Sequence, residues 1–412
     1  MKILNRKNVF LLIAIVLIAV LLIVFRPKRV PAAPAEAAAA ESVAAAEPQP
    51  QPTRAVSEEV TAEGICEISK YGNVKIALPH ARVLEAFEYG DILTVRFGGI
   101  SVDVPLGKSF SDVDSGCPGL FLQMDGETEE TELAVNMGNF AEAYGIAKKI
   151  VHEDKSYEWQ YCDGMSDKTV FTLTLKEKAG YLEQFTIRSM TYTDLREDYP
   201  ALSDAEFANF RPVTAGQIGD GVLFRSASPI DPERKRSTCA DAAAAEAGVT
   251  VFIDLTDNEE AISKYEGVEN SYFAAQKHIA VAASMDFTTA ENREKLAEAF
   301  RYMAAEPGVY CIFCGEGKER TGTAVAVLES LMGAGYDEIK EDYMQSFVNY
   351  YKIGPADAVY GMTVNGNLNR NLTVLFGIDP TAGDLQQAAE KYLASIGLTA
   401  GEIAGLKNNL KG

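Results

Sequence analysis

The sequence predicts three parts: an N-terminal membrane-spanning helix, an antiparallel β domain, and an α/β domain with a mostly parallel sheet flanked by helices. Three observations lead to this fold class: an unbroken apolar run near the start, short alternating segments in the first half, and strand–helix alternation in the second. A length of 412 residues also favours more than one domain. The expected boundaries are 1–29 for the anchor with its basic flanks, 30–57 for a linker, 58–198 for the β-rich domain and 199–412 for the α/β domain.

The apolar run covers residues 9–25, which are 17 consecutive apolar residues and can just span a bilayer. The apolar core of a cleaved signal peptide is normally about 7–15 residues long, so we interpret this run as an uncleaved anchor. Three basic residues stand on each side of it, and this balance gives little information on orientation. A linker rich in Ala, Pro, Glu and Gln follows. We expect the α/β domain to lie outside the cytoplasm, with a cytoplasmic tether as the alternative.

The β-rich region alternates apolar and polar side chains in short segments that Gly, Asp, Pro and Lys separate. Period-two alternation of this kind is typical of strands that bury one face. The pattern predicts antiparallel strands within 73–78, 91–97, 100–106, 169–175 and 185–191, and one helix near 139–148.

Three stretches of this region, SKYGNVKIAL, YGDILTVRFGG and ELAVNMGNFAEAYGI, lie within residues 64–147. They resemble the C-terminal β domain of the S-adenosylmethionine hydroxide adenosyltransferases and their halogenating relatives. The resemblance implies the fold of that domain. The partner domain that completes the active site in that family has no counterpart here, so no catalytic residue is carried over. We expect a binding or spacer role for this domain.

In the α/β region, strands and helices alternate along the chain. The strand VTVFIDL (249–255) follows an Ala-rich helical segment, and the strand VYCIF (309–313) follows a helix with Leu296, Phe300 and Met303 on one face. This alternation predicts a mostly parallel sheet covered by helices. The last 70 or so residues are expected to be helical.

Charge and cysteine spacing exclude several classes of partner. Beyond residue 53 the chain carries 32 Lys and Arg against 56 Asp and Glu, a surface that would repel nucleic acid. The six cysteines show no paired CxxC spacing, so neither zinc nor another cofactor is expected. Cys311 and Cys314 form a lone CxxC, which leaves a redox protein or an inhibitory disulfide as alternatives.

The segment CGEGKERTG (314–322) lies between the second predicted strand and the first turn of a predicted helix. Backbone amides at such a place can point at one spot, and the positive end of the helix dipole adds to them. Thiolates are stabilised there, and an arginine fork matches two phosphate oxygens. We therefore expect Cys314 and Arg320 to be catalytic. The substrate phosphate is expected to contact Gly315, Glu316, Gly317, Lys318, Glu319, Arg320 and Thr321, the last of which can also hydrogen-bond the sulfur as it leaves.

The Cys-x5-Arg spacing of this segment resembles the signature of the cysteine-dependent protein-tyrosine phosphatase superfamily, especially of bacterial members with a GKDRTG-like loop. The resemblance implies that 199–412 is a catalytic domain that hydrolyses phosphomonoesters through a cysteinyl-phosphate without metal or cofactor. A phosphotyrosine protein is the expected substrate, and phosphoinositides or inositol phosphates are the alternative. Further matching segments are NFRPV (209–213), FRSASPI (224–230), VTVFIDLTDNEE (249–260) and DYMQSFVNYY (342–351).

An alkoxide or phenolate leaving group needs a proton from a carboxylic acid on a mobile loop opposite the nucleophile. Asp286 lies 28 residues before Cys314, about where many members of the superfamily carry the acid, and we predict that it is the general acid. Asp254 and Asp257 are the alternatives, because they follow a neighbouring strand at the edge where ligands gather in α/β sheets.

Other residues bear on substrate and rate. A lysine at the place of Lys318 resembles a reader of extra ring phosphates in lipid-directed relatives, whereas Glu316 and Glu319 argue against a highly anionic substrate. The superfamily usually has His before the nucleophile, where this chain has Phe313, and this departure bears on the turnover rate more than on the reaction type. Arg225 is expected to support the loop. A membrane-anchored protein that binds phosphorylated ligands without cleaving them is the alternative of another class.

Overall fold

The computed structural model describes residues 59–114 and 116–412, which belong to one compact unit. The predicted anchor at 9–25 and the linker at 30–57 lie outside the described residues. None of the helices within the described ranges is both long and apolar enough to cross a membrane. The boundary between residues 198 and 199 stays a prediction, because both sides of it fall in the same unit.

The β-rich region is built on one eight-stranded sheet with the order β1-β10-β4-β5-β6-β7-β3-β2. Neighbouring strands are antiparallel except for β5 and β6, which are parallel. Alternate residues of a strand enter one apolar core, as Leu93, Val95 and Phe97 do, in agreement with the period-two pattern. The strands are β1 (Val60–Glu63), β2 (Ile65–Ile68), β3 (Val74–Ile76), β4 (Ile92–Phe97), β5 (Ile100–Gly107), β6 (Pro118–Asp125), β7 (Thr128–Val135) and β10 (Val170–Glu177).

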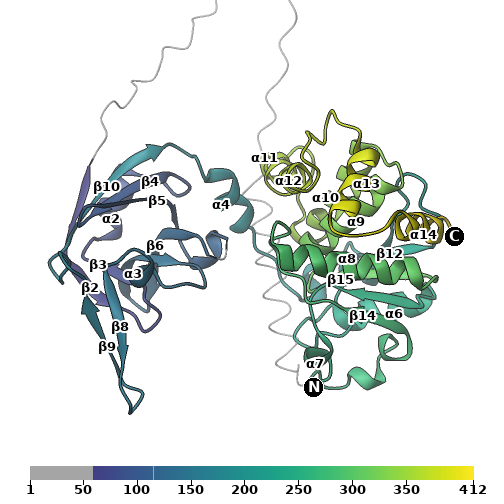
Figure 1. Ribbon diagram of the computed structural model, residues 1–412, viewed down its shortest axis with the longest axis horizontal. Coiled ribbons are helices and arrows are strands. Elements are labelled where there is room, and N and C mark those ends of the chain that lie inside the picture. Colours follow the sequence, from purple (N-terminus) through teal and green to yellow (C-terminus); the bar gives the residue numbers. More distant parts are fainter. Residues whose placement is uncertain (1–58, 115) are drawn as a thin grey trace, which may run out of the picture. The chain divides into compact units, whose positions relative to one another are not determined.

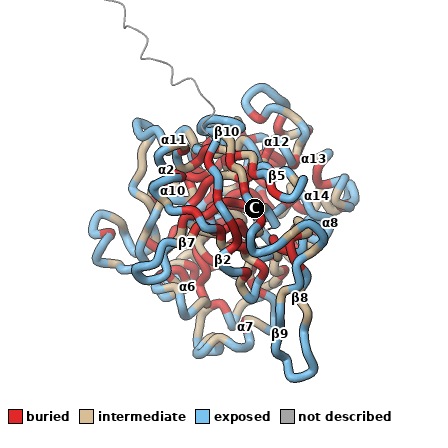
Figure 2. Tube along the Cα trace, turned by 90° about the vertical axis from the view of Figure 1, so that its left-hand side faces the viewer, coloured by how far each residue is buried: buried red, intermediate tan, exposed pale blue. Residues whose placement is uncertain are grey.

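One helix of this region is shorter than predicted, and one predicted strand was wrong. The helix expected near 139–148 is the single turn α3 (Phe140–Ala143), because Gly145 takes a left-handed backbone and the chain continues into β8 (Ala147–Val151). β8 pairs with β9 (Tyr157–Tyr161) in a largely exposed hairpin (Figure 2). The strand expected at 185–191 is instead the helix α4 (Leu182–Arg188), since burial of Phe185 and Ile187 overrides the alternating pattern. The helix α2 (His80–Ala86) was not expected.

The second region is built on a five-stranded sheet with the order β11-β12-β15-β13-β14. Its strands β12, β15 and β14 are labelled in Figure 1. β12, β15, β13 and β14 run parallel, and only the edge strand β11 is antiparallel, as the strand–helix alternation predicts. The strands are β11 (Arg211–Pro212), β12 (Leu223–Ala227), β13 (Val251–Asp254), β14 (Lys277–Ala280) and β15 (Tyr310–Cys314).

Helices cover both faces of this sheet, and the C-terminal residues are helical as predicted. On one face, α8 (Ala290–Ala305), α9 (Glu319–Leu331), α13 (Leu385–Ser395) and α14 (Ala400–Lys411) enclose the larger core. α6 (Ser237–Glu246) packs on the other face. The remaining helical elements are α5 (Asp204–Phe207), α7 (Glu259–Ile262), α10 (Tyr336–Tyr351), α11 (Ala358–Thr363), η5 (Val364–Asn369), α12 (Arg370–Phe376) and the short turns η1 (Phe110–Asp112), η2 (Arg196–Asp198), η3 (Val268–Asn270) and η4 (Phe273–Ala275).

Successive residues of β15 point to opposite faces of the sheet. Cys314 joins the core under α8 and α9, whereas Cys311 joins the core under α6. Three residues of extended strand separate their Cα atoms by roughly 10 Å, and a disulfide needs less than about 7 Å. Burial also raises the pKa of Cys311 far above its ordinary value. The CxxC is therefore not arranged as a redox pair or as an inhibitory disulfide.

Candidate active site

The loop that follows β15 is held in a tight turn. β15 ends at Cys314 and α9 begins at Glu319, so four residues make the connection. Gly317 takes φ +65°, and a Cβ atom there would lie 2.0 Å from the carbonyl oxygen of Ser226. Only glycine satisfies both conditions, which accounts for its presence in the motif.

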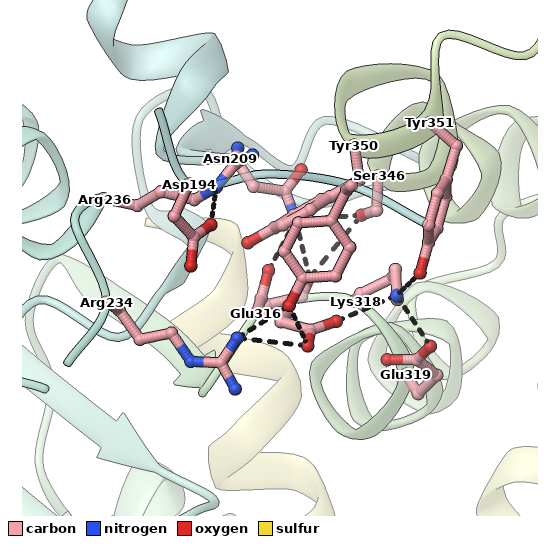
Figure 3. Close-up of polar contacts among 12 residues, drawn as sticks. Asp194, Asn209, Arg234, Arg236, Glu316, Lys318, Glu319, Ser346, Tyr350 and Tyr351 are labelled. Carbon is pink, nitrogen blue, oxygen red and sulfur yellow. Dashed lines mark hydrogen bonds and ion pairs between the residues drawn. The ribbon is translucent and has the colours of Figure 1, made fainter. Parts of the chain in front are cut away.

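Two buried side chains fix the backbone of this loop from one side. Asn209 donates from Nδ2 to the carbonyl oxygens of Glu316 and Gly317, at 3.1 and 3.0 Å (Figure 3). Arg225 donates from Nη2 to the carbonyl oxygens of Gly317 and Lys318, at 2.9 and 3.3 Å. In a trans peptide the N–H points opposite to the C=O, so the amides of residues 317–319 are directed away from Asn209 and Arg225. Arg225 thus supports the loop through these hydrogen bonds, as expected from the sequence.

Cys314 and Arg320 line the same cavity, which has a volume of about 360 Å³. Cys314 is 3% exposed and lies at the carboxyl end of the central strand, where ligands gather in parallel sheets. Of the other predicted phosphate contacts, Gly315, Glu316, Lys318 and Glu319 line this cavity, whereas Gly317 and Thr321 do not. The Thr321 hydroxyl is buried and has no hydrogen-bond partner among the described residues.

The guanidinium of Arg320 is anchored at one end and open at the other. Nη1 donates to the carbonyl oxygens of Ala283 and Leu255, at 3.2 and 3.4 Å. Ala283 follows β14 in the chain, and Leu255 follows β13. Nε is buried and has no partner among the described residues. Nη2 makes no hydrogen bond with a described residue, so it is the nitrogen available to an anion that the cavity admits.

Lys318 faces acidic and aromatic side chains. Its Nζ lies 2.8 Å from Glu316 and 3.1 Å from Glu319, donates to the Tyr351 hydroxyl, and is only 3% exposed (Figure 3). Although burial alone would lower it, the carboxylates of Glu319 and Glu316 raise the pKa of Lys318 well above its usual range. Burial alone would likewise raise the pKa of Glu316, but the Lys318 charge lowers it to about 2. Both side chains are therefore ionised and balance each other.

A buried network behind the loop centres on Asp342 of α10. One oxygen of Asp342 accepts from Arg211 at 2.9 Å, and the other accepts from Arg225, whose side chain is 0% exposed. Although burial opposes it, these two guanidiniums lower the pKa of Asp342. Burial and the charge of Asp342 raise the pKa of nearby Glu329 well above its usual range, and its oxygens have no partner among the described residues. Glu329 is therefore neutral in this network.

Asp286 does not line the cavity that holds Cys314. It lies on the loop between β14 and α8, is exposed, and lines a neighbouring cavity of about 690 Å³. Met285 lines both cavities. Hydrogen bonds from the hydroxyl and the amide of Thr288 lower the pKa of Asp286. Its assignment as general acid stays a prediction.

Asp254 and Asp257 form a buried pair at the end of β13. The Asp254 carboxylate accepts from the amides of Thr256 and Asp257, and the other oxygen has no partner among the described residues. Burial, with the charge of Asp257, raises the pKa of Asp254 to about 8. Burial also raises the pKa of Asp257, whose carboxylate accepts from Tyr265. The pair therefore retains a proton at neutral pH. It is adjacent in the chain to Leu255, whose carbonyl oxygen accepts a hydrogen bond from Arg320.

Several cavity-lining residues were not predicted from the sequence. Arg188 of α4, Arg234 after β12, and Phe347 and Tyr351 of α10 line the cavity with Cys314. Phe347 and Tyr351 lie in the matching segment 342–351, which was the one signal available for them. None of the three histidines lines the cavity, and Phe313 packs with Phe252 and Phe273 on the opposite face of the sheet.

Comparisons with known proteins agree with both halves of this description. Residues 64–151 match the SAM hydroxide adenosyltransferase C-terminal domain, as predicted. No curated protein matches the chain. A solved structure of an uncharacterised conserved protein from Thermotoga maritima is 20% identical, with a TM-score of 0.21, and the match covers 27% of this chain and only 35% of that one.

Two solved structures of the Siw14 catalytic core are also similar. The core catalytic domain of the PP-IP phosphatase Siw14 from S. cerevisiae, in complex with citrate, is 18% identical with a TM-score of 0.25, over 38% of this chain and 84% of that one. A second Siw14 core is 14% identical with a TM-score of 0.23, over 38% and 91%. Residues 206–412, half of the chain, match the tyrosine phosphatase family. With this match and the loop geometry around Cys314, the chain belongs to the tyrosine phosphatase family.

Proposed function

We propose that this protein hydrolyses phosphomonoesters through a cysteinyl-phosphate formed on Cys314. One observation carries the proposal: Cys314 and Arg320 line the same cavity, and Nη2 of Arg320 makes no hydrogen bond with a described residue. A phosphate in this cavity would receive hydrogen bonds from that nitrogen and from loop amides that face away from Asn209 and Arg225. These donors are in place before substrate arrives, which is the condition for stabilising charge that develops in the transition state.

The reaction has two steps. In the first, the Cys314 sulfur attacks phosphorus, a sulfur–phosphorus bond forms, the ester oxygen–phosphorus bond breaks, and the leaving group takes a proton from a carboxylic acid. In the second, water gives a proton to that carboxylate while its oxygen attacks the same phosphorus, the sulfur–phosphorus bond breaks, and inorganic phosphate and the Cys314 thiolate are released. Arg320 and the loop amides stabilise the equatorial oxygens in both steps.

The candidates for the acid are Asp286 and the buried pair of Asp254 and Asp257. Asp286 is exposed on the loop whose Met285 lines the cavity, and we propose that it is the acid. Its lowered pKa is unfavourable for holding a proton at neutral pH. Asp257, in the buried pair with Asp254, has a raised pKa and is the alternative that electrostatics favours.

For the substrate, we propose an aryl phosphate such as phosphotyrosine in a protein. The rings of Phe347 and Tyr351 line the cavity and offer an apolar surface to a phenyl ring. Inositol phosphates or phosphoinositides are the alternative substrates. The anchor at 9–25 would hold the catalytic part outside the cytoplasm, and digestion by a protease added outside intact cells that express the full chain would test this.

The test uses an aryl phosphate in the presence of a metal chelator and a thiol reductant. Wild-type protein should release phosphate, vanadate should inhibit it, and Cys314→Ser should be inert. Cys239→Ser, which removes a partly exposed cysteine outside the cavity, is the matched control and should retain activity. Full activity in Cys314→Ser would refute the mechanism.

The same assay tests the non-catalytic alternative. Reduced wild-type protein that binds vanadate or phosphate but never releases phosphate from any ester would identify a phospho-ligand binding protein. Phosphotyrosyl peptides, phosphoinositides and inositol polyphosphates assayed side by side would then separate the substrate classes.

A further inference from the structure

The side chain of Arg234 reaches the cavity of Cys314 from outside the phosphate-binding loop. Arg234 follows β12 in the chain and lines the cavity together with Arg320. A Cβ atom placed on Gly315 would lie 3.6 Å from Nη2 of Arg234 and 3.9 Å from Nη2 of Arg320. Two guanidinium groups therefore approach one point beside the nucleophile.

Neighbouring side chains hold two of the three nitrogen atoms of Arg234. Nη1 donates to the Tyr192 hydroxyl at 2.7 Å and to the Glu316 carboxylate at 3.2 Å (Figure 3). Nε lies 3.6 Å from the Asp231 carboxylate. No hydrogen bond from Nη2 to any described residue accompanies these contacts. The guanidinium is thus oriented in advance, with one donor group left open toward the loop.

The segment that carries Tyr192 is itself fixed. The buried side chain of Arg236 donates to the carbonyl oxygen of Thr193 at 2.8 Å and pairs with Asp194 at 2.6 Å. The ring of Tyr192 packs edge-on against Tyr350, at 4.8 Å between centroids. Tyr192 therefore holds Arg234 from a rigid support rather than from a mobile side chain.

The loop lysine does not offer a comparable donor. Lys318 lies between Glu316 and Glu319 and is 3% exposed, whereas the Arg234 side chain is 31% exposed. An anion at the position of the lysine would have to displace two carboxylates. An anion beside Nη2 of Arg234 would displace no hydrogen bond between described residues.

We propose that Arg234 forms a second anion subsite for the substrate. Arg320 holds the phosphoryl group that reacts with Cys314, and Nη2 of Arg234 binds another phosphate or carboxylate on the same molecule, close to the first. The proposal rests on the proposed reaction and narrows its substrate: it favours phosphomonoesters that carry a second acidic group near the reacting phosphate, as inositol polyphosphates do, over phosphotyrosine.

Binding of two uncleavable probes tests this subsite without any turnover. Methylphosphonate presents one phosphonate group, and methylenediphosphonate presents two that share one carbon atom. Calorimetric titration gives the dissociation constant of each probe, and their ratio reports the second group alone. In the wild type, methylenediphosphonate should bind about tenfold more tightly, the effect of one added hydrogen bond between charged groups.

Three variants complete the test. Arg234→Gln should reduce the ratio to about one or two, because the charge and the open donor are both lost. Arg234→Lys keeps the charge but lacks Nη2, and should give a ratio between the two. Lys235→Gln removes an exposed positive charge one residue away and should keep the wild-type ratio, which controls for general charge attraction.

An unchanged ratio in Arg234→Gln, or an equal fall in Lys235→Gln, would overturn the subsite. Methylphosphonate binding shows whether the cavity of each variant is intact. If Arg234→Gln no longer binds methylphosphonate, the test rests on Arg234→Lys. A wild-type ratio of the two dissociation constants in Arg234→Lys would then overturn the proposal. The two proposals fail separately: an inactive wild type that shows the predicted ratios refutes only the phosphatase reaction, and an active enzyme without them refutes only the subsite.

Discussion

Asp342 supports the phosphate-binding loop from behind, and its charge can be removed with little change in shape. It accepts from Arg211 at 2.9 Å and from Arg225, whose guanidinium holds the carbonyl oxygens of Gly317 and Lys318. Asp342→Asn leaves both arginines without their counter-ion. The change therefore tests whether this ion network holds the loop in place.

The magnitude follows from burial. Breaking a buried ion pair by removing one partner costs about 3–5 kcal/mol, and the two side chains here are 0% and 13% exposed. The Asn side chain keeps one oxygen that can accept a hydrogen bond, so we expect Asp342→Asn to lower the free energy of unfolding by about 3 kcal/mol, the lower end of this range. Glu329 adds a second effect, because its pKa is raised in part by Asp342 and it can ionise in the variant as a substitute. The double variant Asp342→Asn, Glu329→Gln should therefore lose more free energy of unfolding than the two single variants lose together, by about 0.5–3 kcal/mol.

Urea unfolding at neutral pH measures these costs. Far-ultraviolet circular dichroism is the suitable signal, because the only tryptophan, Trp159, lies on β9 of the two-stranded β8–β9 sheet and packs against the core of the β-rich region. Glu260→Gln, which breaks an exposed pair with Lys264, is the control and should cost no more than about 0.5 kcal/mol. A loss below about 1 kcal/mol in Asp342→Asn, or additive effects in the double variant, would contradict the role given to the network.

Three further predictions concern the loop and the acids. Gly317→Ala should lower the free energy of unfolding in urea by several kcal/mol and abolish phosphatase activity, because its Cβ would lie 2.0 Å from the carbonyl oxygen of Ser226. The control Gly248→Ala has a similar φ of +69° but no atom within 4 Å of its Cβ, and should lower that free energy by only about 1 kcal/mol. Asp254 has a folded pKa near 8 against an ordinary value of 3.8, so the folded state keeps a proton that the unfolded state releases. Stability should thus fall by up to about 1.4 kcal/mol per pH unit as pH rises from 4 to 8, and Asp254→Asn should flatten this slope; an unchanged slope would show that Asp254 is already ionised. Asp286→Asn should slow phenyl phosphate hydrolysis about 10²-fold or more but 4-nitrophenyl phosphate hydrolysis much less, and the same selectivity in Asp257→Asn instead would transfer the acid role to the buried pair.

The core of the site could be predicted because its residues are contiguous in sequence. Cys314, Gly317 and Arg320 lie in one loop between a strand and a helix, and the backbone alone brings them together. Arg234 and Tyr351 reach the same cavity from distant segments, and no spacing rule places them there. Lys318 looks like a free cation in the sequence, and only the packing shows that two carboxylates and a tyrosine occupy it.

Of the fold, the parallel sheet was predicted well because its buried strands are continuous apolar runs between helices. The strand 309–313 and the strand 249–255 correspond to β15 and β13 within one or two residues. The prediction for segment 185–191 was wrong because its alternating apolar and polar residues are typical of a strand. In the structure, tertiary packing buries Phe185 and Ile187 while the segment is helical. Edge elements such as β11 contain two residues and carry no pattern to detect.

The central claim is that phosphate passes through the sulfur of Cys314. Rapid quenching of the wild-type enzyme with acid during turnover of an aryl phosphate, followed by mass spectrometry of its peptides, tests this most directly. The account predicts one added phosphoryl group on the peptide that contains Cys314, formed within the first turnover and removed as substrate runs out. Steady release of phosphate with that peptide unmodified, or with the group on another residue, would contradict it.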